Sequence, residues 1–242
     1  MLPNTHMLDG IAATNNFDPF VPGRYVDWLD MLAAARPEAQ AKLLRLMGVG
    51  VIETLDRAQP YGVRFQEIDG NRLHWLPCAR LADDPDEART LVFSEEVDLT
   101  GQVVLEGLKM LPADDCQKTQ LSIETHDPQV LETTDPSSKP SSWTARSSNP
   151  NRIELDVVAT APGWLMISDT WYPGWRAWVD GEPAPLLRAN YLFRALHLIE
   201  GDHRVVIAYR PISFYAGLAL SLLSIAISGF LWTRKPSQNL PS

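Results

Sequence analysis

Five residues in the last third of the sequence have the chemistry to bind a sugar or a phosphate group. They are Trp171, Tyr172, Arg188, Asn190 and Arg194. Aromatic rings pack on the apolar faces of sugars, while arginine and asparagine donate hydrogen bonds to hydroxyl and phosphate oxygens. We predict these residues as candidate contacts to a glycan or a lipid headgroup. Fold maintenance, with bulky rings filling a core, is the alternative that this pattern leaves open.

The sequence has no pattern typical of a catalytic or metal-binding site. Its five histidines are scattered without HxH or HExxH spacing, and there is no GxSxG motif. Four acidic residues lie close together, but they are expected in and before the solvated first turn of a short helix over residues 84–91. They are Asp83, Asp84, Asp86 and Glu87. We therefore expect no catalytic residue, no metal and no cofactor in this chain.

Charge and cysteine content narrow the possible partners. The net charge is −9 and there is no basic stripe, which excludes a nucleic-acid partner because phosphate binding needs clustered lysine and arginine. The two cysteines, Cys78 and Cys116, could form one disulfide in an oxidising compartment or remain two separate thiols. The sequence alone leaves both states open.

The run from Phe214 to Trp232 predicts a transmembrane helix. It contains no charged residue and no proline, and as a helix it would span roughly 28 Å, close to the bilayer hydrocarbon thickness. Aromatic residues lie at both ends, as is typical of membrane interfaces. Small residues recur on one face, which predicts contact with other membrane helices. They are Gly217, Ser221, Ser224 and Ser228.

The first half of the chain is expected to contain two helices and then short strands. Residues 24–47 have helical periodicity, and Pro37 suits the start of the second helix. Extended runs follow over residues 49–55, 63–68 and 72–76, and Asp69-Gly70-Asn71 favours a hairpin between the last two. Residues 112–150 are polar and rich in proline, serine and threonine, so loops and weak edge strands are expected there.

The clearest strand pattern lies near the C-terminus. Residues 152–159 alternate between apolar and polar side chains, which is typical of a strand with one buried face. Four further strands are expected, over residues 163–167, 176–179, 192–198 and 203–209. Hairpins are predicted at Asp180-Gly181 and Glu200-Gly201-Asp202. The predicted fold class is mainly β: an antiparallel β-sandwich with short N-terminal helices and one C-terminal transmembrane helix.

Residues 168–211 resemble the C-terminal signature of the YfhO family of bacterial membrane proteins. The matching positions, in chain order, are Tyr172-Pro173-Gly174-Trp175, Val179-Asp180-Gly181, Arg188-Ala189-Asn190, Phe193-Arg194, Gly201, His203 and Tyr209-Arg210-Pro211. Weaker similarity extends upstream to Asn151-Arg152-Ile153 and to residues 44–52. The resemblance is therefore loose in the first half of the chain and close from about residue 150 onward.

The resemblance implies a part in glycosylating cell-envelope polymers from lipid-linked sugars. Family members are large, multi-spanning and similar to GT-C glycosyltransferases, with a catalytic carboxylate near their first membrane helices. No segment here corresponds to those helices, so no catalytic residue is carried over and no enzyme activity is expected of the isolated chain. Residues 1–23 also lack a secretory signal pattern. We therefore expect a fragment that lacks the catalytic membrane region.

The resemblance also implies an orientation in the bacterial cytoplasmic membrane. We expect an N-terminal helical segment over residues 1–48 and an extracytoplasmic β-rich domain over 49–212, with the sandwich at 150–211. We expect a transmembrane helix over 213–233 and a cytoplasmic tail over 234–242 to follow.

The expected role is an accessory domain that contacts membrane lipids, other membrane helices, and a glycan or lipid-linked sugar. Two alternatives remain open: a structural cap on the membrane helices, and a tail-anchored binding module with no role in glycosyl transfer.

Overall fold

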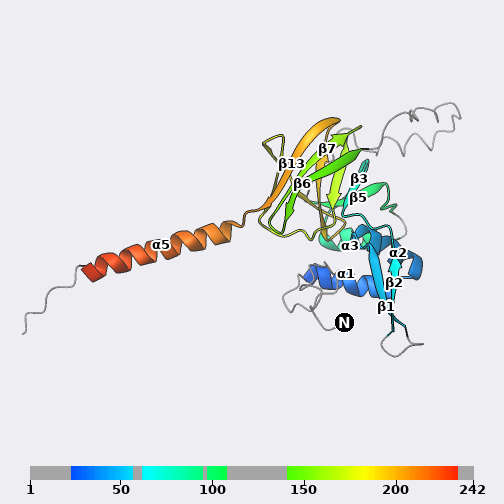
Figure 1. Cartoon of the computed structure of the whole chain (residues 1–242), viewed down its shortest axis with the longest axis horizontal. Helices are drawn as coiled ribbons and strands as arrows, with labels where there is room; N and C mark the ends of the chain where they lie inside the picture. The colour runs from blue at the N-terminus through cyan, green and yellow to red at the C-terminus, as the bar shows by residue number, and fades with distance from the viewer. Residues whose placement is uncertain (1–22, 57–61, 95–96, 108–140, 234–242) are drawn as a thin grey trace, which may run out of the picture.

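The computed structural model describes residues 23–56, 62–94, 97–107 and 141–233. Two large β-sheets and a group of helices form the folded part, and helix α5 (Ile212–Thr233) extends away from it on one side (Figure 1). The predicted fold class is confirmed, because the chain is mainly β with several antiparallel sheets, short helices and one C-terminal apolar helix.

Helices α1 (Gly23–Ala34) and α2 (Pro37–Leu46) occupy the segment predicted to be helical, and Pro37 opens the second. Trp28 of α1 is fully buried, and its ring lies 5.0 Å from the rings of Phe93 and Phe193 in edge-on geometry. This arrangement is a favourable one for aromatic rings. The apolar side of α1 therefore fixes this helix against the sheet that contains Phe193.

The five-stranded sheet has the order β10-β9-β13-β7-β6, and all its pairs are antiparallel. Its strands are β6 (Ser142–Asn149), β7 (Arg152–Ala159), β9 (Trp175–Val179), β10 (Glu182–Ala184) and β13 (Gly201–Tyr209). The alternation predicted for β7 is confirmed, since its apolar residues from Ile153 to Ala159 are buried at every second position. Strand β6 is an edge strand, as the polar composition of its region predicts.

The six-stranded sheet has the order β3-β8-β12-β11-β5-β4. Its strands are β3 (Leu73–Leu76), β4 (Cys78–Ala82), β5 (Gln102–Glu106), β8 (Gly163–Ile167), β11 (Leu187–Ala189) and β12 (Phe193–Leu198). Strands β4 and β5 run parallel, and helix α3 (Pro85–Phe93) lies between them in the chain. As predicted, Asp84 caps α3: its carboxylate accepts a hydrogen bond from the Glu87 backbone N–H at 2.8 Å.

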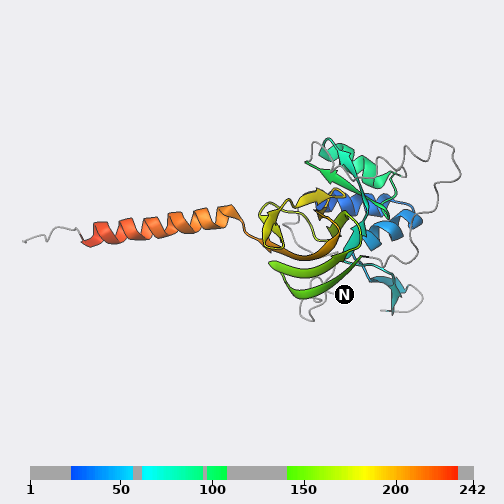
Figure 2. The ribbon, with the colours of Figure 1, turned by 90° about the horizontal axis from the view of Figure 1, so that it is seen from above.

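The six-stranded sheet is covered on both faces. One core lies between the two sheets and draws its side chains mainly from β7, β8, β12 and β13. The other core lies between the six-stranded sheet and helices α1 to α3. In Figure 2 these helices lie together on the side away from the green strands β6 and β7. Because both faces are covered, all five residues of β8 are buried.

Two of the predicted hairpins are wrong. Strand β2 (Gly62–Glu67) pairs with β1 (Val51–Asp56) in a separate two-stranded sheet, so Asp69-Gly70-Asn71 leads from that sheet to β3 in another. Likewise, Glu200-Gly201-Asp202 carries the chain from β12 in one sheet to β13 in the other. The reason is that turn residues specify a reversal of the chain but not the partner strand. Strand β12 is buried on both faces, so it lies in the middle of the six-stranded sheet and pairs with β8 and β11 rather than with β13.

The hairpin at Asp180-Gly181 is confirmed and joins β9 to β10. Both residues have positive φ, 55° and 90°, as a tight hairpin turn requires. The Asp180 carboxylate accepts the Arg204 backbone N–H at 2.7 Å and lies 2.8 Å from His203 Nδ1. These contacts lower the pKa of Asp180, Arg204 having the larger effect, and they tie the turn to β13.

Helix α5 follows β13 after only two residues, Arg210 and Pro211. As predicted from the uncharged run, it is one continuous helix of 22 residues, long and apolar enough to cross a membrane. None of its residues is buried by the rest of the described chain. Its side chains are therefore available to lipid or to other helices.

The loop that precedes β9 is clamped against the junction of β13 and α5. Gly174 has φ +110°, and a Cβ at this position would lie 2.9 Å from Tyr209 Cε2 and 3.1 Å from Pro211 Cα. The Arg210 backbone N–H donates to the Gly174 carbonyl oxygen at 2.7 Å. A glycine is required here because both the backbone angle and the space exclude a side chain.

We expect Gly174→Ala to destabilise the domain more than Gly181→Ala. Both residues have positive φ, but nothing lies within 4 Å of a Cβ at Gly181. Gly181→Ala should therefore cost about 1–2 kcal/mol of backbone strain, and Gly174→Ala a further cost of about 1–3 kcal/mol from overpacking. Denaturant unfolding of the full chain in detergent measures the difference, and equal costs would contradict a close contact at Gly174.

Candidate functional site

Three of the five predicted contact residues, Trp171, Tyr172 and Arg188, meet around a small cavity of 160 Å³. It lies beside β11 and the first turn of α1, and we call it the arginine notch. Its lining residues are Gly23, Arg24, Thr170, Trp171, Tyr172, Pro173, Arg188, Tyr191 and Leu192.

Two arginines share one carboxylate in the arginine notch. Arg24 Nη1 lies 2.6 Å from Glu106 Oε1 and also donates to the Tyr191 carbonyl oxygen at 3.1 Å. Arg188 Nη1 lies farther away, 3.7 Å from Glu106 Oε2. Burial and repulsion from Arg24 lower the pKa of Arg188, against the attraction of Glu106. Arg188 is therefore the group that would gain most from an incoming anion.

The two aromatic residues of the notch differ in their exposure. Arg188 Cζ lies 4.3 Å from the centroid of the Trp171 ring, so one side of this ring already holds a cation. Trp171 is also fixed by its backbone N–H, which donates to the Leu192 carbonyl oxygen at 2.7 Å. Tyr172, in contrast, is 52% exposed. Tyr172 rather than Trp171 therefore presents an open ring to solvent.

Asn190 lies inside the fold, away from any surface ligand. Its backbone N–H donates to the Val104 carbonyl oxygen at 2.7 Å, and its side-chain oxygen accepts the Val104 N–H at 2.8 Å. Asn190 and Tyr191 both have positive φ, 45° and 68°, in the tight turn between β11 and β12. The Tyr191 hydroxyl donates to Asp27 at 2.7 Å, which joins this turn to α1. Asn190 thus contacts protein where a ligand contact was predicted.

Arg194 is also buried, with a side-chain exposure of 4%. Its Nη2 lies 2.9 Å from Asp169 Oδ2, and its Cζ lies 3.9 Å from the centroid of the Trp175 ring. Arg72 binds the same carboxylate at 2.7 Å from the solvent side. Burial lowers the pKa of Arg194 to about 10, which leaves it charged at neutral pH. Arg194 thus supports the loop before Trp171 from below and does not reach the notch surface.

Glu106, Arg188 and Arg194 form a row across three neighbouring strands. Arg188 is directly opposite Glu106 on β5 and opposite Arg194 on β12. Residues in such register point to the same face of a sheet. The sequence could not predict this row, because Glu106 and Arg24 belong to no local motif and approach each other from positions 82 residues apart.

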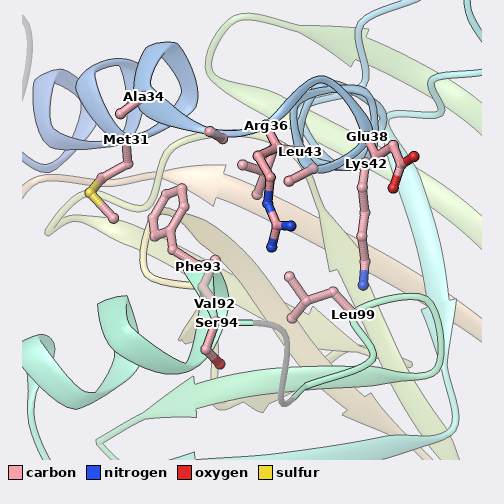
Figure 3. Close-up of a pocket in the computed structure, with 12 residues that line it drawn as sticks. Met31, Ala34, Arg36, Glu38, Lys42, Leu43, Val92, Phe93, Ser94 and Leu99 are labelled. Carbon is pink, nitrogen blue, oxygen red and sulfur yellow. The ribbon is translucent and has the colours of Figure 1, made fainter.

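A larger cavity of 560 Å³ lies between α1, α2 and α3 (Figure 3). Arg36 and Lys42 extend into it, and most of the other lining side chains are apolar. Nothing in the sequence predicted this cavity. Its apolar lining is typical of a seam between packed helices as well as of a ligand pocket.

One comparison with known proteins gives a match. The model of a family described as "Bacterial membrane protein YfhO" matches residues 106–221, just under half of the chain. Over this stretch the chain is similar to the YfhO family. It begins at Glu106, contains all five predicted contact residues and ends within α5. No curated protein and no solved structure matches the chain. The YfhO match, together with the one candidate membrane span found among the described residues, supports membrane association of this protein.

Cys78, upstream of the YfhO stretch, is disulfide-bonded. The other cysteine of the chain, Cys116, lies outside the described residues. Disulfides persist in oxidising compartments and are rare in the cytosol. The sequence left open whether Cys78 forms a disulfide or remains a separate thiol, and in the structure it forms a disulfide.

We expect Arg194→Met to lower the free energy of unfolding by about 3 kcal/mol, because it removes one partner of a largely buried ion pair. Arg72→Met should cost at most about 1 kcal/mol, since Arg72 binds the same carboxylate from an exposed position. Denaturant unfolding of both variants of the full chain measures the difference. A fully stable Arg194→Met protein would contradict the structural role of this ion pair.

Proposed function

We propose that this chain supplies the extracytoplasmic accessory domain of a glycosyltransferase-like membrane protein. In this proposal the arginine notch holds a glycan or the head of a lipid-linked sugar at the membrane surface. The observation that carries it is the combination of a loosely paired Arg188 with an exposed Tyr172 in one cavity. A guanidinium suits phosphate or hydroxyl oxygens, and an open ring suits a sugar face.

The position of the notch relative to the membrane supports the proposal. Pro173 lines the notch, and the next residue, Gly174, contacts Pro211 directly before α5. If α5 crosses the bilayer, the notch opens close to the headgroups from which a lipid-linked sugar would be presented. The disulfide at Cys78 favours the outer face of the membrane, because the cytosol keeps most thiols reduced.

The division of the chain follows from the same proposal. Residues 49–212 would lie outside, with residues 1–48 preceding them, 213–233 in the membrane and 234–242 in the cytoplasm. In the bilayer the face of Gly217, Ser221, Ser224 and Ser228 would meet other helices. The Ser224 hydroxyl already donates to the Leu220 carbonyl oxygen at 2.9 Å, so close packing rather than hydrogen bonding would drive that contact. Fragment status remains a prediction, which the genomic sequence upstream can test.

A structural cap is the second candidate function. It is favoured by the burial of Asn190 and Arg194, because these signature positions maintain the fold without reaching a ligand. Substitution of exposed notch residues distinguishes the two functions, because it should reduce glycan transfer by an accessory domain but not by a structural cap.

We expect Tyr172→Ala to reduce glycan transfer by the intact protein about fivefold, since an aromatic contact contributes about 1 kcal/mol beyond simple burial. Glycan content of the envelope polymer in cells carrying only the variant measures this. Thermal stability should change little, because the ring is half exposed.

Phe65→Ala is the matched control, because Phe65 is an exposed ring on β2, outside the notch. If it reduces transfer as much as Tyr172→Ala, or if Tyr172→Ala has no effect, the notch is not a binding site. The cap would then be the better account.

A further inference from the structure

The two ends of the five-stranded sheet carry exposed charges of opposite sign, while the charged residues between them pair with one another, Arg146 with Asp156 and Arg204 with Glu154. The end next to α5 carries basic side chains: Arg152 at the start of β7, Arg176 on β9, and Arg210 just after β13. The opposite end carries acidic ones at its turns and at the start of β10. These are Asp180, Glu182, Glu200 and Asp202. A chain with a net charge of −9 thus presents a basic end toward its membrane helix.

Two of these arginines are available for an external partner. Arg152 binds Glu154 at 2.8 Å, but neither Arg176 nor Arg210 forms an ion pair with a residue that the structure describes. Both are exposed, and Arg210 Cζ lies 4.8 Å from the centroid of the half-buried Trp178 ring. An arginine held over a tryptophan and open to solvent can still bind an anion with its N–H groups.

The chain geometry keeps both arginines near the bilayer. Arg176 is directly opposite Ala208, which lies four residues before Ile212 at the start of α5. An extended chain covers at most about 3.6 Å per residue, so Ala208 lies within roughly 14 Å of the membrane helix. The headgroup region extends roughly 5–7 Å beyond the hydrocarbon core, and a long arginine side chain spans much of the remaining distance.

We propose that Arg176 and Arg210 bind the headgroups of anionic lipids and so dock the basic end of the sheet on the membrane. Without such contacts the overall negative charge would repel the domain from an anionic surface. The acidic turns at the far end then point away from the bilayer, which fixes the tilt of the domain on α5. This docking concerns the exposed side of the five-stranded sheet and does not depend on a ligand in the arginine notch.

The test uses the full oxidised chain in nanodiscs, with a nitroxide on Tyr172→Cys, beside Gly174 and α5. Relaxation of this label by a nickel-chelating lipid reports how often the loop lies at headgroup depth. Discs of phosphatidylcholine alone are compared with discs that also contain phosphatidylglycerol. Two arginines at an anionic surface should favour the docked state by roughly 30-fold, and high salt should remove most of this preference.

The double variant Arg176→Gln/Arg210→Gln should lose the preference for phosphatidylglycerol discs. Arg80→Gln/Arg89→Gln removes the same charge from β4 and α3 and should retain it. Equal relaxation in both kinds of disc, or loss of the preference in both double variants alike, would overturn the proposal. Thermal unfolding of each variant separates loss of docking from loss of the fold. If the Arg176→Gln/Arg210→Gln protein does not fold, the Arg176→Gln single variant replaces it, and loss of the preference for phosphatidylglycerol discs is again the expected result.

Discussion

The two-residue connection between β13 and α5 is the constraint on which the rest of the arrangement depends. Strand β13 lies in the middle of the five-stranded sheet and pairs with both β7 and β9 along most of its length. A central strand cannot move without its sheet, so a membrane helix attached to it almost directly determines which end of the sheet faces the bilayer. The Gly174 loop, packed against Pro211, reinforces this connection.

A polar row on the other sheet supports the loop that is packed against this connection. Glu106, Arg188 and Arg194 lie opposite one another, and Trp171 and Trp175 cover the two arginines on the side of the Gly174 loop. A buried arginine is tolerated only when paired, and Asp169 supplies the partner of Arg194, while Glu106 lies 3.7 Å from the half-buried Arg188. The same side chains that hold the loop also leave Arg188 loosely paired, so structural support and the proposed binding site share one set of residues.

Local patterns predicted much of the fold but little of the site. Periodicity identified β7 and α5, and turn chemistry identified the hairpin at Asp180-Gly181, because each depends on neighbours in sequence. Strand partners and the parallel pair β4–β5 depend on which faces are buried, which no short segment reveals. For the same reason Arg188 was recognised as a candidate but Arg24 and Glu106 were not. Asn190 has the chemistry of a ligand contact, yet its backbone N–H and its side-chain oxygen both bind Val104 inside the fold.

The central proposal is that the folded part lies on the extracytoplasmic side of the membrane. Asp202→Cys introduces a thiol at an exposed turn far from α5, while the bonded Cys78 stays unreactive without a reductant. Labelling of intact cells with a membrane-impermeant maleimide, compared with lysed cells, is the most direct measurement. The account predicts equal labelling before and after lysis. Labelling that appears only after lysis would place the domain in the cytoplasm and contradict it.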